Sequence, residues 1–141
     1  MTIRKLFCLA AAIFWIGFTF AQNTPDAVPK DGPVIKFGKK SHDFGDIVQG
    51  DKVEHTFYFT NEGNEPLIIT NVQVTCGCTT PKGWPRDPIM PGHSGEITVG
   101  FSSGGKIGRQ HKPVTIISNA VNKDGSQISI TTNILPPSSS N

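Results

Sequence analysis

The sequence predicts an all-β protein, an immunoglobulin-like β-sandwich of about seven antiparallel strands. Its runs of alternating apolar and polar residues have a period of two, as in strands with one buried and one solvated face. Turn-forming residues separate these runs roughly every 8–12 residues, and residues 34–135 show no helical period. An eight-stranded barrel is the alternative, but the short apolar faces and the strand count favour the sandwich.

The first 21 residues have the pattern of a signal peptide. Arg4 and Lys5 supply a short basic segment, and residues 6–20 are apolar apart from Thr19. The small residues at positions 19 and 21 predict cleavage before Gln22. The apolar run is shorter than the ~20 residues that a membrane span needs, which disfavours an uncleaved anchor. We therefore expect a secreted or periplasmic protein without stable membrane insertion after cleavage.

The mature chain is expected to have three parts. Residues 22–33 form a flexible polar leader, residues 34–135 form the sandwich domain, and residues 136–141 form a disordered tail. Cleavage removes Arg4 and Lys5, so eleven basic and eleven acidic residues remain and the formal net charge falls from +2 to zero. A neutral domain has no electrostatic attraction to nucleic acid, so nucleic-acid binding is not expected.

Seven runs supply the expected strands. Val34–Phe37 is a short β-prone run, and Phe44–Asp51 mixes apolar residues with turn residues. Val53–Thr60 has the clearest alternation. In Leu67–Val74 the alternation slips near Thr70–Asn71, which predicts a β-bulge. The later runs lie at residues 96–101, 112–118 and 127–134. The residues expected to close the core are Phe57, Phe59, Ile69, Val99, Phe101 and Ile116.

The stretch from Cys76 to Gly92 departs from the strand pattern and is the candidate functional region. It holds both cysteines of the mature chain, together with its single tryptophan and single methionine, among many glycines and prolines. A functional site is usually sought where a sequence departs locally from its own repeating pattern. The candidate functional residues are Cys76, Gly77, Cys78, Thr79 and Trp84.

The Cys76-Gly77-Cys78 motif allows three interpretations. A disulfide between residues two apart needs a bend at Gly77, because a flat strand holds the two β-carbons too far apart. Such a pair either shapes the end of the strand, since cysteines pack as small hydrophobic residues, or takes part in thiol–disulfide exchange. The third interpretation is a copper(I) site completed by Met90 and His93, which is the one cofactor considered.

The tryptophan and the histidines also have structural interpretations. Trp84 is expected either to fold back as a lid on the core or to stand out as a binding anchor. His55 shares the parity of the core phenylalanines and is expected to be half-buried, whereas His42 and His111 are expected at the surface. The sequence has no phosphate-binding loop between a strand and a helix and no evident carboxylate pair, so catalysis is not expected.

Residues across the whole domain match one family pattern. Its most specific segment is Cys76–Thr79 followed by Pro81 and Trp84, and the residue before the first cysteine is Thr75, where the family often has serine. Other matching positions are Phe44, Gly45, Ile47, Gly50, His55, Phe57, Phe59, Asn61, Gly63, Pro66, Leu67, Ile69, Ile89, Pro91, Gly92, Gly95, Ile97, Val99, Phe101, Gly108, Lys112, Val114, Ile116, Ser118 and Asn119. Residues 34–134 thus resemble a bacterial exported family of domains of unknown function, numbered 1573. That family is similar in fold to the Hydin-type and major-sperm-protein immunoglobulin-like domains. The resemblance implies export and this fold, and it implies no established activity.

We expect an exported, non-catalytic immunoglobulin-like module of the cell envelope that binds a protein partner or has a structural role. The sheet edges and the stretch from Cys76 to Gly92 are the expected contact surfaces, because edge pairing is a recurrent binding mode of β-sheets. The alternative is a small thiol-redox or copper-binding protein that uses Cys76-Gly77-Cys78.

Overall fold

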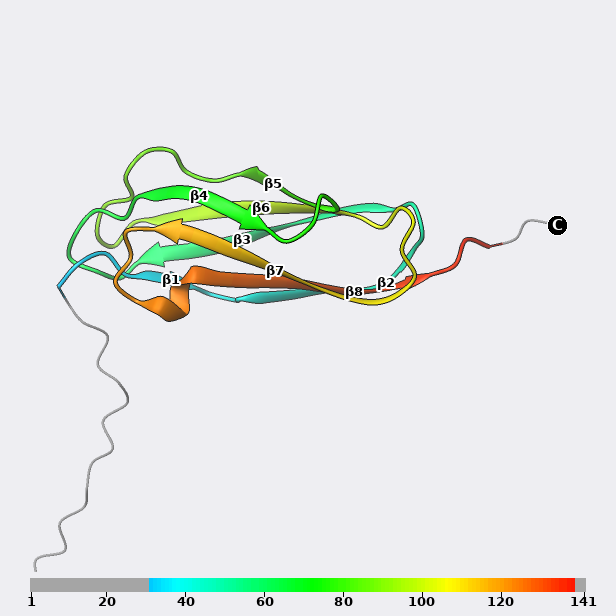
Figure 1. Ribbon diagram of the computed structural model, residues 1–141. Helices are drawn as coiled ribbons and strands as arrows, with labels where there is room; N and C mark the ends of the chain where they lie inside the picture. Colours follow the sequence, from blue (N-terminus) through cyan, green and yellow to red (C-terminus); the bar gives the residue numbers. More distant parts are fainter. Residues whose placement is uncertain (1–30, 139–141) are drawn as a thin grey trace, which may run out of the picture.

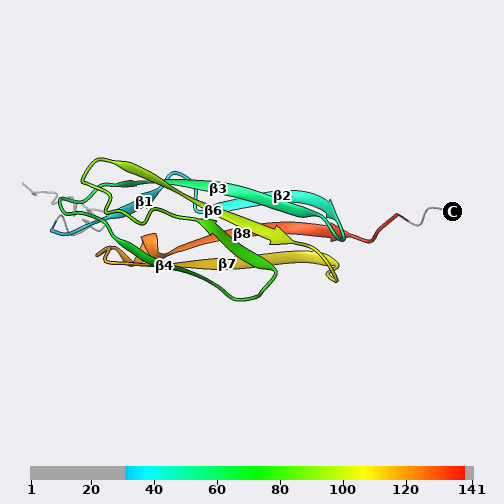
Figure 2. The same cartoon turned by 90° about the horizontal axis from the view of Figure 1, so that it is seen from above.

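The computed structural model describes residues 31–138, which form a sandwich of two four-stranded sheets (Figures 1 and 2). The immunoglobulin-like fold predicted from the sequence is confirmed. The predicted signal peptide, most of the leader and the last three residues lie outside the described residues. The elements are β1 (Ile35–Phe37), β2 (Ser41–Val48), β3 (Lys52–Asn61), β4 (Ile69–Val74), β5 (Thr79–Gly83), β6 (Ser94–Ser102), β7 (Gly108–Ser118), the 3₁₀ turn η1 (Lys123–Ser126) and β8 (Gln127–Leu135).

The two sheets have different strand orders and share one core. Sheet A has the order β1-β3-β6-β5, and sheet B has the order β2-β8-β7-β4. Figure 2 shows β3 and β6 of sheet A lying over β7 and β8 of sheet B. Within residues 31–138, no helix is long and apolar enough to cross a membrane.

The structure has eight strands where the sequence predicts about seven. The additional strand is β5, which lies inside the irregular stretch from Cys76 to Gly92 and pairs with β6. It contains Pro81 and occupies the edge of sheet A, where a missing backbone N–H is tolerated.

One strand pair corrects the expectation of a fully antiparallel sandwich, because β2 pairs with β8 in parallel. The physical reason is that β1 and β2 belong to one extended segment. This segment leaves sheet A after Phe37 and joins sheet B through a hydrogen bond from the amide of Ser129 to the carbonyl of Lys40 (2.8 Å). The direction of β2 is therefore already fixed by β1.

The core predicted from the sequence is confirmed. All six residues named for it, which lie on β3, β4, β6 and β7, are buried with at most 4% of their surface exposed. The predicted bulge is also present, because the β4–β7 register shifts between Ile69 and Asn71. This shift returns Val72 to the buried face that Ile69 occupies.

Asn61 is the buried polar residue at which three segments of sheet A meet. Its side chain is 0% exposed. Its Oδ1 accepts hydrogen bonds from the amides of Val34 (3.2 Å) and Gly63 (3.0 Å). Its Nδ2 donates to the carbonyls of Glu65 (2.7 Å) and Ile89 (2.9 Å). The amide uses its full capacity of two acceptor and two donor bonds, so it ties β1 and the β3–β4 turn to the loop before β6.

Candidate functional site

The Cys76-Gly77-Cys78 motif forms the crossover from sheet B to sheet A. It follows the end of β4 and precedes the start of β5. The two sulfurs are bonded, with the α-carbons 5.3 Å apart. The chain bends over these residues, because the amide of Thr79 bonds back to the carbonyl of Cys76 (3.2 Å). The disulfide therefore staples a tight turn at the point where the chain changes sheets.

The disulfide lies at the border of the core. Both cysteines are half-buried, and Cys78 packs against the buried cluster. The hydroxyl of the buried Thr79 lies 3.7 Å from the sulfur of Cys76 and 3.9 Å from that of Cys78. Because part of this surface faces solvent, the bond is open to attack by a small thiolate, which is the requirement of thiol–disulfide exchange.

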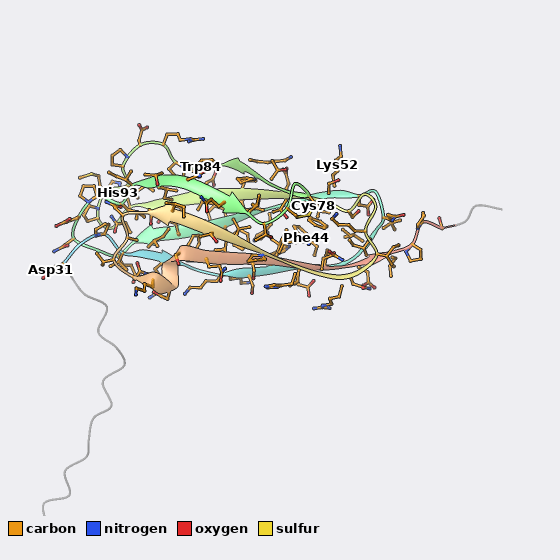
Figure 3. All side chains as sticks on the ribbon, viewed as in Figure 1. Asp31, Phe44, Lys52, Cys78, Trp84 and His93 are labelled. Carbon is orange, nitrogen blue, oxygen red and sulfur yellow. A yellow bond between two sulfur atoms is a disulfide. The ribbon has the colours of Figure 1, made fainter. Side chains whose placement is uncertain are left out.

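Trp84 adopts the placement of a lid. Its side chain is half-buried and packs against the core, and its indole Nε1 is buried without a hydrogen-bond partner in the described part of the chain (Figure 3). The guanidinium of Arg86 lies 3.9 Å from the ring centroid and covers the ring from outside. This stacking leaves the ring little free face for an external partner.

The structure does not bring the four residues considered for copper together. The carbonyl of Cys78 accepts a hydrogen bond from Ser102, the last residue of β6, whereas His93 directly precedes the first residue of that strand. A nine-residue strand spans roughly 27–30 Å, so the two residues lie at different ends of the sandwich (Figure 3). Met90 lies beside His93, because its carbonyl accepts from the His93 amide (3.0 Å). Within residues 31–138, no group of three or more His, Cys, Asp or Glu side chains is placed to hold a metal ion.

A second region, which the sequence does not reveal, is built around two histidines. His42 of β2 and His55 of β3 are half-buried and stack in parallel, with ring centroids 3.6 Å apart and planes 6° apart. The expected surface position of His42 is therefore wrong. The strand β2 begins at Ser41 rather than Phe44, so His42 faces inward from sheet B toward sheet A. His111 is exposed, as predicted.

The histidine pair lies against aromatic rings and one lysine. Phe44 meets the ring of His42 edge-on at 4.6 Å, and Phe57 meets the ring of His55 edge-on at 4.8 Å. Burial lowers the pKa of His55 below its usual value, and electrostatic interaction with His42 and Lys39 lowers it further. His55 therefore stays neutral to a lower pH than an exposed histidine does.

Beside this pair, half of β3 has an open edge. The strand β1 pairs only with residues 59–61 of β3, and the amide of Gly38 makes one further bond, to the carbonyl of Tyr58 (3.2 Å). The chain then crosses to sheet B, so the strand position beside Lys52–Phe57 is vacant in the described structure. We call this stretch the β3 edge.

The orientation of the backbone at the β3 edge follows from the ladder with β6. The amide of Asn61 bonds to the carbonyl of His93, so the odd-numbered residues of β3 direct their backbone groups toward β6. The amide and carbonyl groups of Glu54 and Thr56 therefore point into the vacant position. A hollow of about 370 Å³ adjoins this edge, lined by Gly38, Lys39, His55, Thr56, Phe57 and Tyr58.

The sequence model of one family, described as "Protein of unknown function (DUF1573)", matches residues 35–134. The chain belongs to the DUF1573 family. The family resemblance drawn from the sequence is thereby confirmed, and the match spans the described sandwich from β1 to β8. A search of curated proteins finds no match.

Solved structures support the fold of this DUF1573 protein. A protein of unknown function from Porphyromonas gingivalis W83 matches with a TM-score of 0.63 and 19% identity, over 79% of this chain and 51% of that one. The seventh PapD-like (ASH) domain of human CEP192 matches with a TM-score of 0.57 and 9% identity, over 96% of this chain and 99% of that domain. The Vibrio cholerae VesB protease matches with a TM-score of 0.53 and 15% identity, over 72% of this chain and 31% of that one.

The matched structures share the fold of this chain at low sequence identity. The DUF1573 chain spans about half of the P. gingivalis protein and about a third of VesB. At 9–19% identity the likeness shows a shared immunoglobulin-like architecture.

Proposed function

We propose that this DUF1573 protein is an exported, non-catalytic binding module of the cell envelope that takes a protein partner along the β3 edge. The observation that carries the proposal is the strand position that β1 vacates after Phe37. A sheet edge with free amides and carbonyls is a template for one more strand. The free groups of Glu54 and Thr56 supply this template, and the adjoining hollow has room for the side chains of an incoming segment.

The polar side chains beside the β3 edge are engaged in contacts within the protein, which is consistent with binding without catalysis. The rings of His42 and His55 stack on each other and on phenylalanines, so they are packed as part of the sandwich. The hydroxyl of Thr56 is bonded to that of Thr98 (2.9 Å) on the outer face of sheet A. These contacts favour a rigid docking edge, and export follows from the signal-peptide pattern of residues 1–21.

Photocrosslinking on the exported protein tests this proposal. A benzophenone amino acid at Tyr58, which is 65% exposed beside the edge, should give a crosslinked adduct with a protein partner. The intact mass of the exported protein should be that of a chain that begins at Gln22. The same group at Ile117, 38% exposed on β7 of the other sheet, should give none. Thr56→Pro should abolish the adduct, because it removes a free edge amide and leaves the ladder to β6 intact. Adducts that are equal at both positions, or that survive Thr56→Pro, would contradict the proposal.

A second candidate function is thiol–disulfide exchange at Cys76 and Cys78, favoured by their half-exposed disulfide at the sheet crossover. One glutathione thiolate attacks a sulfur, forms a mixed disulfide and releases the other cysteine as a thiolate. A second glutathione thiolate then releases oxidised glutathione and leaves both cysteines reduced, so two electrons pass from glutathione to the pair. The reduced pair offers two soft thiolates that suit copper(I), whereas Met90 and His93 lie at the far end of the sandwich.

Under this second candidate, the thiol content should change reversibly from none to both cysteines as a glutathione buffer is made more reducing. The staple closes a loop of only three residues, so replacing both cysteines by serine should cost no more than roughly 1.6 kcal/mol of stability. Thiol titration against buffer potential, with and without copper(I), measures the first effect, and urea unfolding measures the second. A pair that stays oxidised at strongly reducing potentials and takes up no copper would remove this candidate.

A further inference from the structure

We infer that the β3 edge binds an extended, acidic segment of another protein, whose carboxylates lie beside the edge. This inference rests on the proposed function. The basis is the charge around the vacant strand position. Lys39 lies at one end of the edge and Lys52 at the other, and both side chains are exposed. Within the described range, neither of them forms an ion pair.

Several other charges near the edge are held in ion pairs. Glu54, the one acidic residue on the β3 edge, is bonded to Lys82 (2.7 Å). On β2, Asp43 pairs with Arg109 (3.2 Å). In the described part of the chain, Asp46 and Asp51 accept hydrogen bonds only from neutral donors, the amide group of Asn133 (2.8 Å) and the backbone amide of Val48 (2.9 Å). Similar pairs occupy Lys36 with Glu62 and Lys40 with Asp124. On the β3 edge itself, the charges that an incoming strand meets outside ion pairs are those of Lys39 and Lys52.

The histidine pair adds a third group that favours a carboxylate. His55 lines the hollow beside the edge, and the groups that face it are His42, Lys39 and, beyond His42, the carboxylate of Asp43. A carboxylate brought beside His55 stabilises the imidazolium and raises its pKa from the lowered value of the free protein. Binding is then accompanied by proton uptake, so it strengthens as the pH falls through the histidine range.

A second copy of this chain fits the edge less well than an acidic segment. If two β3 edges pair in antiparallel fashion, the free backbone amides and carbonyls of Glu54 and Thr56 in one copy must lie opposite those of the other copy. Centred on His55, this pairing brings Lys39 of one copy toward Lys52 of the other. Centred on Glu54, it sets two glutamates directly opposite each other. Like charges in these positions destabilise the pairing.

Fluorescence anisotropy with three labelled peptides tests the inference on the mature protein. The probes are an alternating glutamate–valine hexapeptide, its lysine–valine counterpart, and the acidic peptide with every second amide N-methylated. We expect the acidic peptide to bind at least about tenfold more tightly than the basic one. N-methylation should abolish binding, because it removes the hydrogen-bond donors of the added strand. Binding should also tighten as the pH falls from about 7.5 to about 5.5.

Charge-reversed variants locate the effect. The double substitution Lys39→Glu/Lys52→Glu should weaken binding of the acidic peptide about tenfold or more. The double substitution Lys106→Glu/Lys112→Glu changes the net charge equally at the β6–β7 turn and on β7, and it should have little effect. Circular dichroism checks that both variants fold.

Several results would overturn the inference. The first is equal affinity for the acidic and basic peptides. The second is an equal loss of affinity for the acidic peptide in both double variants. The third is a dimer of this protein, seen in sedimentation experiments, that dissociates when the peptide is added. Affinity that stays constant or falls toward pH 5.5 would remove the histidine pair from the recognition of the carboxylate. If the Tyr58 crosslink forms while the peptides show no preference for acidic charge, only the chemistry of the occupant is wrong. If the crosslink itself fails, the proposed function is wrong.

Discussion

Replacing Asn61 by leucine is expected to lower the free energy of unfolding by about 3–5 kcal/mol. The substitution keeps a buried side chain of similar size and removes all four hydrogen bonds of the amide. The buried amide of Val34 and the half-buried amide of Gly63 lose their acceptor, and an orphaned buried group costs about 1–3 kcal/mol. Urea unfolding of the two proteins measures the difference.

Asn64→Ala is the matched control for this prediction. Asn64 lies three residues further on and is exposed, and its Oδ1 accepts one hydrogen bond from the amide of Gly32 (2.7 Å). Water replaces that bond in the variant, so the loss should be no more than about 0.5–1 kcal/mol. If Asn61→Leu costs as little as the control does, the buried amide is not what holds the three segments together.

Phe57→Ala is expected to cost about 3–5 kcal/mol, the usual range for a large-to-small substitution in a core. Phe57 is 1% exposed, lies opposite Ile97 in the ladder and meets the ring of His55 edge-on. The cavity that its loss leaves is bounded by two hydrogen-bonded sheets, which cannot close over it. Differential scanning calorimetry or urea unfolding gives the value.

Thr56→Ala is the control on the neighbouring residue. The side chain of Thr56 lies on the outer face of sheet A, where its hydroxyl bonds to that of Thr98 and water can replace it. The expected loss is about 0.5 kcal/mol or less. Similar losses from Phe57→Ala and Thr56→Ala would contradict the register of β3 in the sandwich.

The parts of the fold that the sequence predicts are those with a local signal. Alternation along β3 and β6 identifies their buried faces, because side chains of a strand point to opposite sides. The slip between Ile69 and Val72 marks the bulge for the same reason. By contrast, β5 has the sequence Thr-Thr-Pro-Lys-Gly, in which apolar and polar residues do not alternate. The parallel β2–β8 pair joins the first and last parts of the domain, and no local pattern reports such a pairing.

The candidate sites also include some features that the local sequence shows and others that depend on the fold. The spacing of Cys76 and Cys78 makes the motif visible, and the need for a bend at Gly77 follows from disulfide geometry alone. The distance between these cysteines and His93 depends on the path of β6, which spacing in the sequence does not give. The stacked His42 and His55 come from different sheets, and the β3 edge exists because β1 leaves sheet A early. Both depend on contacts between distant parts of the chain.

The parallel pairing of β2 with β8 also sets the mechanical behaviour of the domain. The described chain enters at one end of the sandwich and leaves at the opposite end (Figures 1 and 3). Tension between the two ends therefore pulls β2 and β8 past each other along their length, from the pair Ser41–Ser129 to the pair Val48–Leu135. Such shear loads the hydrogen bonds of the ladder together, whereas a perpendicular pull would open them one at a time. A pull along the long axis of the sandwich is therefore resisted by the whole β2–β8 ladder at once.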